Sequence, residues 1–586
     1  MYFKRFTCWY SKNMINKTIT IILLIITATI LIHARFNRSE GVVIWDVKSY
    51  YSYLPATLIY NDLSYSFMDD EDKDFGKWIW PFETPIGKKA VGTTYGMSLL
   101  YSPFFMLGHV AALVSNYDAD GYSRPYHVAL NFSAMFYLWL GMICLVKVLR
   151  RYFKDKVIAF TLFAIVLGTN LFYYTTREAP MTHSFLFSLF ALFLWLTIKF
   201  YDKPSLKRIL IAGLVAGLIT LVRPTNIIVL LAFFLWNISS FDDLKNRARL
   251  FTKKYYWVAL MAAAFVLIWV PQFIYWHYVS GKIFYFTYGE SGGGFFFNNP
   301  QIFNILFSYK KGWLVYTPLM IFALAGIFML RKKIPGLFLP LLLFKAVNIY
   351  ILASWWCWWF GGSFGLRSFI ESYAFLSIPF ACFVDMGFRQ KNYLRIPVLS
   401  VLVLLIGFNQ FQTRQYNNNA IHWWWMNKEA YWETFLKLHP TERFWEVITI
   451  PDYDAAREGI YREIEPSEED IPITPEAKWK NPIPKEDILD WLTLKIKNDS
   501  TYRESLKPAL ENQEDTLRVA REVAEKKIED KGLEYWDKKM AIELIIEEIR
   551  GKPEMMKSIE EKAIKNNNPL DSQLVYDAIW LYNEER

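Results

Sequence analysis

Long apolar runs separated by short basic loops are the feature that most limits what this chain can fold into. A helix of about 20 apolar residues crosses the hydrocarbon core of a bilayer, and it satisfies its own backbone hydrogen bonds there. We therefore expect a mainly α, polytopic α-helical membrane protein with about eleven spans. The expected spans are 16–34, 126–149, 157–174, 184–200, 209–222, 226–240, 257–276, 313–330, 336–353, 369–387 and 395–411.

The basic residues predict the orientation of these spans. Loops rich in Lys and Arg stay on the cytoplasmic side of a membrane. This rule puts the N-terminus in the cytoplasm and the C-terminus in the periplasm of a bacterial cytoplasmic (inner) membrane. One further apolar run, Met97–Ser115, would invert every later loop if it crossed, so we expect an interfacial or re-entrant helix there. Lys and Arg cluster in alternate loops, at 4–17, 147–156, 199–208, 245–254, 331–333 and 389–395.

Charge divides the chain into unlike parts. Residues 451–586 hold 33 acidic and 22 basic side chains, whereas residues 1–450 hold 43 basic and 23 acidic ones. Because the basic residues lie in short loops between apolar runs, they indicate membrane topology and not nucleic-acid binding. We expect three regions: a transmembrane domain over 1–412 with a first periplasmic loop over 35–125, a periplasmic linker over 413–490, and a helical periplasmic domain over 491–586.

The helical tail contains a possible two-unit repeat. Ile496–Ala524 aligns with Ile549–Asp577 at an offset of about 53 residues, and each unit has the pattern of two amphipathic helices. Acidic helices of this kind often bind other proteins, so the tail is a candidate docking surface for an envelope protein partner.

The outer loops are long and rich in polar and aromatic residues, so we expect any chemistry there. Asp46 follows the first span by about a dozen residues and lies among Trp45, Tyr50 and further tyrosines. A carboxylate in such partly dry surroundings is suited to accept a proton from a hydroxyl nucleophile. The alternative is an exposed aspartate that only caps a short helix.

Arg367 lies where an outer loop returns to the membrane, directly after a Gly-Gly-Ser-Phe-Gly stretch at 361–365. A charge near the apolar core is costly and therefore usually has a partner or a function. The planar guanidinium matches phosphate oxygens, and glycines let backbone N–H groups approach an anion. The alternative is a pair between Arg367 and Glu371, one turn later, that only anchors the helix.

Three more outer segments could contribute. Arg177, Glu178 and His183 form one cluster, and Arg223 lies at a turn broken by a proline. Each alone fits either an anion site or a plain interfacial arginine.

The glycine-rich loop 288–311 is either a mobile lid or a connector. The acidic run at 68–74 is more typical of an exposed loop than of a metal site, so we predict no metal and no cofactor, and leave a divalent ion open.

Six segments, spread over most of the membrane part, together resemble the GT-C superfamily of polyprenyl-phosphate-sugar glycosyltransferases, in particular a Bacteroidota-type branch. Their order along the chain carries the resemblance more than any one of them. The segments are Trp45–Ala56 (WDVKSYYSYLPA), Thr94–His109 (TYGMSLLYSPFFMLGH), Glu178–Ser184 (EAPMTHS), Arg223–Asn226 (RPTN), Ser308–Pro318 (SYKKGWLVYTP) and Trp359–Glu371 (WFGGSFGLRSFIE).

The resemblance implies roles for individual residues. Asp46 would activate the acceptor, and Arg367, Arg177 and Lys89 would bind the donor phosphate. The other site candidates are Tyr50, Glu178, His183, Arg223 and Glu371. The implied partners are a polyprenyl-phosphate-linked sugar, the lipid bilayer, and a periplasmic glycan, lipid or protein acceptor.

The expected activity is therefore an inverting GT-C-type transfer of a sugar to a periplasmic acceptor. One alternative is a non-catalytic GT-C-like subunit of an envelope complex that docks through residues 491–586. A transporter is a second alternative, but transporters usually show internal symmetry among their spans, and none is visible here.

Overall fold

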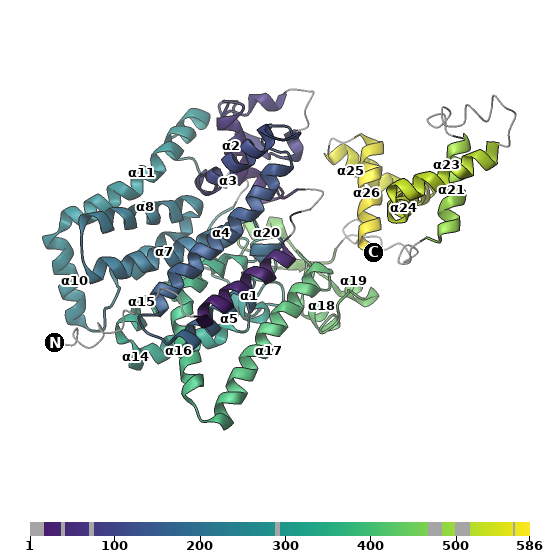
Figure 1. Cartoon of the computed structure of the whole chain (residues 1–586). Coiled ribbons are helices and arrows are strands. Elements are labelled where there is room, and N and C mark those ends of the chain that lie inside the picture. The colour runs from purple at the N-terminus through teal and green to yellow at the C-terminus, as the bar shows by residue number, and fades with distance from the viewer. Residues whose placement is uncertain are drawn as a thin grey trace. The chain divides into compact units, whose positions relative to one another are not determined.

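The computed structural model describes residues 17–34, 36, 41–69, 75–287, 293–466, 483–498, 516–566 and 569–585. It contains two compact units, Met1–Glu465 and Pro466–Arg586, which are described separately below (Figure 1). The structure is 72% helical with almost no sheet, which confirms the predicted mainly α fold.

Every predicted span of the first unit overlaps at least one helix. The helices are α1 (Lys17–His33), α4 (Arg124–Leu149), α5 (Asp155–Leu167), α6 (Tyr173–Thr176), α7 (Thr182–Asp202), α8 (Leu206–Val222), η4 (Pro224–Ile228), α9 (Val229–Phe234), α10 (Phe241–Lys253), α11 (Tyr255–Ser280), α12 (Ile302–Phe307), α13 (Trp313–Tyr316), α14 (Met320–Lys333), α15 (Pro335–Ala353), η6 (Arg367–Ser372), α16 (Tyr373–Arg389) and α17 (Asn392–Asn417).

Within the described ranges, seven helical segments are long and apolar enough to cross a membrane, which confirms a multi-pass membrane protein. The expected number was about eleven, and the remaining runs form shorter helices. The run 313–330, for example, is divided into α13 and α14, with Pro318 between them. A proline cannot donate the next backbone hydrogen bond, so the helix is interrupted. The seven segments are α3 (Gly96–Leu113), α4, α7, α11, α15, η6–α16 and α17.

The described part of the loop 35–125, which follows α1, is an ordered structure of its own. It contains α2 (Asp46–Leu58), η2 (Ser66–Asp69), η3 (Phe75–Lys77), and an antiparallel hairpin of β1 (Pro81–Glu83) and β2 (Lys89–Val91) with Phe82 opposite Ala90. The loop ends with α3, which packs on α2 and α4. Because α3 is long enough to span, its expected interfacial placement stays a prediction. Most of the acidic run at 68–74 lies outside the described residues.

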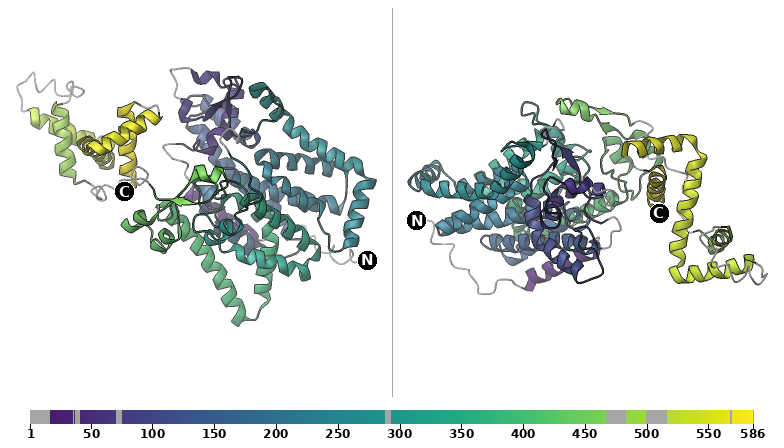
Figure 2. Two further views of the ribbon diagram at one scale, coloured as in Figure 1. Left: turned by 180° about the vertical axis from the view of Figure 1, so that it is seen from behind. Right: turned by 90° about the horizontal axis from the view of Figure 1, so that it is seen from above.

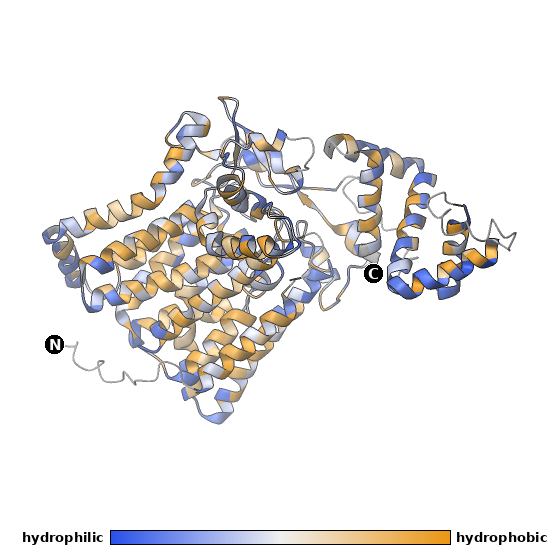
Figure 3. Cartoon of the chain, turned by 45° about the horizontal axis from the view of Figure 1, so that its top comes forward, coloured by the Kyte–Doolittle hydropathy of each residue, from blue (hydrophilic) through white to orange (hydrophobic). Residues whose placement is uncertain are grey.

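Helices of the first unit approach closely where small residues line their contacts. The pairs α4–α7, α8–α11 and α14–α16 pack against each other, and Figure 3 shows that the helices of the first unit are largely hydrophobic. At Gly326 of α14, an added Cβ would lie 2.0 Å from the carbonyl oxygen of Pro379 in α16. Without a hydrophobic force between helices in lipid, such close van der Waals packing stabilises the bundle.

The segment after α17 differs from the expected linker over 413–490. It contains α18 (Lys428–Glu433), α19 (Glu442–Val447), α20 (Tyr453–Arg457), and a short pairing of β3 (Ile450–Pro451) with β4 (Glu463–Ile464). Apolar side chains such as Met426, Phe444 and Ile448 are buried in the core of the first unit. These side chains hold the segment on the first unit, and the boundary between units therefore falls at Glu465.

The second unit is a set of helices (Figure 2). In it, α21 packs on α23, and α24 packs on α25 and α26. The helices α23 and α26 are both 16 residues long and begin 54 residues apart, close to the offset of the proposed sequence repeat. Residues 499–515 of that repeat lie outside the described residues. The helices are α21 (Lys485–Asn498), α23 (Thr516–Lys531), α24 (Leu533–Gly551), α25 (Pro553–Asn566) and α26 (Leu570–Glu585).

The close contact of α14 with α16 leads to a stability prediction. Gly326→Ala should lower the free energy of unfolding by about 1–3 kcal/mol, because its methyl group would overlap the Pro379 backbone. Gly407→Ala in α17 is the matched control, since no atom lies within 4 Å of the added carbon. Thermal unfolding in detergent, followed by tryptophan fluorescence, should show a lower midpoint for Gly326→Ala only. Equal midpoints would contradict the packing.

Candidate active site

The fold brings Asp46 and Arg367 together at one end of the first unit. Asp46 is the first residue of α2, and Arg367 is the first residue of η6. The Asp46 Oδ2 lies 3.1 Å from an Arg367 guanidinium nitrogen, and the two side chains are 40% and 17% exposed. The alternative pair between Arg367 and Glu371 does not form in this structure, because Glu371 binds other residues.

Glycines shape the loop that carries Arg367. Gly361 and Gly365 have φ of 66° and 57°, in the left-handed region that favours glycine. At Gly362, an added Cβ would lie 2.4 Å from the ring of Trp423, so the indole packs directly on the backbone. The N–H of Phe364 donates to the Tyr174 hydroxyl at 3.0 Å, which ties the loop to α6. The loop is therefore fixed on both sides before it reaches Arg367.

Glu371 is the centre of a second, buried cluster. Arg223 donates to Glu371 Oε1 at 2.7 Å, and Asn226 donates to the same oxygen at 3.4 Å. His183 lies on the other side, with Nδ1 at 3.8 Å from Oε2. Arg367 also interacts electrostatically with His183. Four of the residues predicted from the sequence therefore lie around η6: Arg223, Glu371, His183 and Arg367.

Arg177 and Glu178 follow α6, next to this cluster. Glu178 accepts a hydrogen bond from the Tyr173 hydroxyl at 3.4 Å and interacts electrostatically with Arg367, as Tyr50 also does. Arg177 is half-buried, and burial lowers the pKa of its guanidinium. Among the described carboxylates, none forms an ion pair with Arg177. A half-buried arginine without a carboxylate partner is available to an anionic ligand.

Lys89 lies in the β1–β2 hairpin and pairs with Asp69. The two residues line a shallow pocket of about 260 Å³ together with Phe82 and Glu83. No described contact joins Lys89 to Arg367 or Arg177. Its predicted role as a phosphate ligand therefore stays a prediction, and the structure gives it a different neighbour.

Two buried lysines were not among the candidate residues. Lys311 donates to the backbone oxygen of Trp423 at 2.6 Å and to that of Ser363, which lies in the Arg367 loop. Burial lowers the pKa of Lys311 well below its usual value, and Lys310 and Arg367 lower it further. In α15, Lys345 is 3.4 Å from the centre of the Phe369 ring. The pair of adjacent lysines directly before Gly312 is the sequence feature that could have indicated Lys311 as a site residue.

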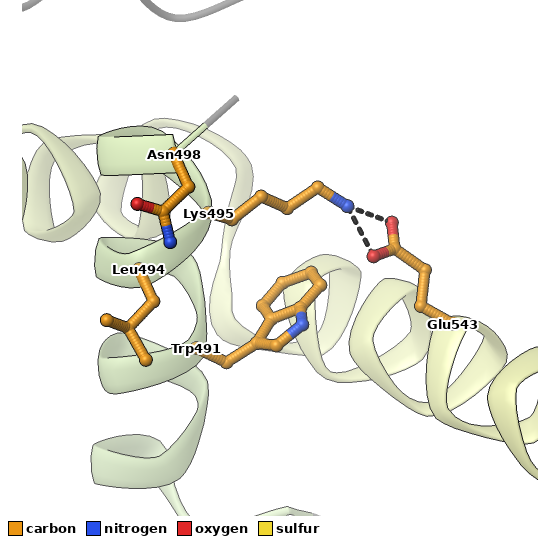
Figure 4. Close-up of a pocket in the computed structure, with 5 residues that line it drawn as sticks. All are labelled: Trp491, Leu494, Lys495, Asn498 and Glu543. Atoms are coloured by element: carbon orange, nitrogen blue, oxygen red, sulfur yellow. Dashed lines mark hydrogen bonds and ion pairs between the residues drawn. The ribbon is translucent and has the colours of Figure 1, made fainter. Parts of the chain in front are cut away.

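No group of three or more His, Cys, Asp or Glu residues in the described ranges could hold a metal ion. In the second unit, a shallow pocket of about 380 Å³ lies beside an ion pair between Lys495 and Glu543 (Figure 4). None of the predicted site residues lines it. Its other lining residues are Trp491, Leu494 and Asn498.

The fold and these clusters define a class: a polytopic helical membrane protein with a carboxylate–arginine pair and further buried cations at one end of the bundle. The particular family is indicated by residues 126–276, from α4 through most of α11, which match the family model described as dolichyl-phosphate-mannose-protein mannosyltransferase. The matched model describes a GT-C superfamily domain, so the similarity over these residues agrees with the predicted resemblance and points to a polyprenyl-phosphate-sugar glycosyltransferase. No curated protein matches the chain.

From the cluster around Glu371 we expect a large loss of stability when the charge of Glu371 is removed. Glu371→Gln should lower the free energy of unfolding by about 3 kcal/mol, because Arg223 would remain partly buried without its carboxylate. Asp202→Asn, which breaks the exposed pair with Arg151, should cost about 1 kcal/mol or less. Chemical denaturation in detergent compares the two variants. A smaller effect for Glu371→Gln than for Asp202→Asn would contradict the assignment.

We expect His422 to cause part of the pH dependence of the free energy of unfolding. Its Nδ1 accepts from the N–H groups of Trp424 and Trp425, and burial lowers its pKa to about 3. Below pH 6.5 the unfolded state binds a proton that the folded state excludes, so stability falls as pH falls. Between pH 7.5 and 5 the loss should be about 2 kcal/mol.

The measurement compares unfolding of the wild type and His422→Asn at both pH values. The variant keeps a hydrogen-bond acceptor but does not titrate, so its loss between pH 7.5 and 5 should be smaller by that amount. An identical loss in both proteins would show that His422 contributes nothing to it.

Proposed function

We propose that this protein transfers a sugar from a polyprenyl-phosphate donor to the hydroxyl of a glycan, lipid or protein acceptor on the periplasmic face of the bacterial inner membrane. The observation that supports this most is the contact between Asp46 and Arg367. It places a candidate base and a candidate phosphate ligand side by side in a site that solvent reaches.

In the proposed reaction, Asp46 takes the proton of the acceptor hydroxyl. The acceptor oxygen forms a bond to the anomeric carbon, and the bond from that carbon to the phosphate oxygen breaks. Polyprenyl phosphate leaves with the electron pair of that bond. A single displacement of this kind inverts the configuration at the anomeric carbon, since attack comes from the face opposite the leaving group.

Arg367 and Arg177 would stabilise the charge that develops on the leaving phosphate. Preorganised cations in a site of low dielectric are worth more than the same cations in water. Arg367 is held by its loop and by Asp46, and Arg177 is half-buried with no described carboxylate partner. Donor binding would give both guanidinium groups an anion, and it would weaken the hold of Arg367 on Asp46.

The buried Glu371 cluster would act indirectly. Glu371 is one turn after Arg367 on η6 and binds Arg223 of the broken α8–η4 turn. This ion pair fixes η6 against α7 and α8, and therefore fixes the position of Arg367. We assign Glu371, Arg223 and His183 as positioning residues, and Tyr50 and Glu178 as neighbours of Arg367 that adjust its charge environment.

The second unit contains none of the site residues, so we propose it as a docking domain for an envelope partner and not as part of the reaction. A chain truncated after Glu465, at the boundary of the compact units, should retain transfer activity. Loss of transfer in a truncated protein that still folds would show that the second unit takes part in catalysis.

Asp46→Asn should abolish transfer while leaving the protein folded. Removing a general base typically lowers a rate by about 10²–10⁴-fold. The measurement is incorporation of labelled sugar from a panel of polyprenyl-phosphate sugars by the purified protein in nanodiscs. Asp454→Asn is the matched control, because this aspartate lies in α20 and its side chain is 92% exposed. Equal transfer by wild type and Asp46→Asn would exclude Asp46 as the base.

A further inference from the structure

Three indole rings from distant parts of the chain meet beside Asp46. Trp45 immediately precedes it, Trp80 lies just before β1, and Trp423 follows α17. The ring centres of Trp45 and Trp80 are 6.3 Å apart with the rings nearly edge to face. Those of Trp45 and Trp423 are 5.7 Å apart with the rings tilted by 32°. Trp45 therefore connects the other two into one aromatic surface, which we call the indole platform.

The indole platform is open to solvent. Trp45 is 49% exposed and Trp80 is 45% exposed. Clustered exposed aromatic surface at a protein face commonly marks a binding site. Asp46 is itself partly exposed at the end of this surface. A molecule that covers the platform would therefore also reach the candidate base.

The platform is held rigidly in place before any ligand binds. Trp45 has φ of 50°, a conformation that is costly for a residue with a side chain and that typically persists at functional sites. The backbone oxygen of Trp423 accepts hydrogen bonds from Lys311 and from the N–H of Ser363. The Trp423 ring lies on Gly362, and a side chain at position 362 would displace this ring. Preorganisation of this kind lowers the entropy cost of binding.

A membrane-interface role explains these features less well. Tryptophans of an interfacial belt place their rings among lipid head groups and need no fixed orientation relative to each other. In contrast, the indole platform combines three segments, a strained backbone and a neighbouring carboxylate. Lys48, one turn after Trp45, lies with its Nζ 4.7 Å from the centre of the Trp80 ring, which adds a charged hydrogen-bond donor at the edge.

We propose that the indole platform binds a sugar ring of a carbohydrate acceptor and presents one of its hydroxyl groups to Asp46. A pyranose has an apolar C–H face that packs on indole and hydroxyl groups at its rim that bind Asp46 and Lys48. This inference rests on the proposed glycosyl transfer and narrows the acceptor from a glycan, lipid or protein to a glycan. Trp45, Trp80 and Trp423 are then specificity-determining residues.

The first experiment measures binding and not transfer. Full-length protein in nanodiscs is titrated with three soluble trisaccharides, maltotriose, mannotriose and chitotriose, and binding is followed by saturation-transfer NMR. At least one should bind, and Trp80→Ala and Trp45→Ala should each weaken that binding about tenfold, the loss of roughly one aromatic contact. Trp432→Ala is the matched control, because Trp432 is 52% exposed but lies on tyrosines and a phenylalanine away from Asp46.

The outcomes separate the inference from the proposed function. Failure of all three trisaccharides to bind, or unchanged binding in Trp80→Ala and Trp45→Ala, overturns the inference. Asp46→Asn should still bind the trisaccharide, since the platform remains intact. In the transfer assay, sugar transfer to a serine- and threonine-rich peptide but to none of the trisaccharides would also overturn the inference while leaving the glycosyltransferase function standing. A protein that binds trisaccharides by the platform but transfers no sugar would instead contradict the proposed function.

Discussion

The site depends on how the protein accommodates charges at one end of an apolar helix bundle. Arg367 and Glu371 lie one turn apart on η6, yet they bind different partners, Asp46 of the first outer loop and Arg223 of the α8–η4 turn. A buried charge is tolerated only when it is paired and hydrogen-bonded. The two ion pairs therefore connect η6 to α2 and to α8, and every other feature of the site is positioned relative to them.

Aromatic and backbone contacts hold the site in place together with the ion pairs. Lys311 binds the backbone oxygens of Ser363 in the Arg367 loop and of Trp423, and Trp423 packs on Gly362 in that loop. The segment after α17 thereby becomes part of the site although it follows the last predicted span. The same segment contains His422 and contributes one ring of the indole platform, so the mouth of the site is formed by the first outer loop and by residues beyond α17 together.

Several residues that the sequence analysis proposed for the site have other neighbours in the structure than expected. Arg223 and His183 fitted either an anion site or an interfacial position, and both lie around Glu371. Lys89 was grouped with Arg367 and Arg177, but its described partner is Asp69. Lys345 and Trp423 were not candidates, because a lysine in an apolar run or a tryptophan in an aromatic stretch is indistinguishable in sequence from many others.

The sequence alone determined the membrane class, the position of most helices and the family resemblance, because apolar runs of this length have few other solutions. It also indicated Asp46 and Arg367 individually. Only the tertiary structure decided which charges pair, since residues hundreds of positions apart meet through helix packing that no local pattern records. The same reason explains the boundary at Glu465: buried contacts of Met426, Phe444 and Ile448, and not composition, attach residues 413–465 to the first unit.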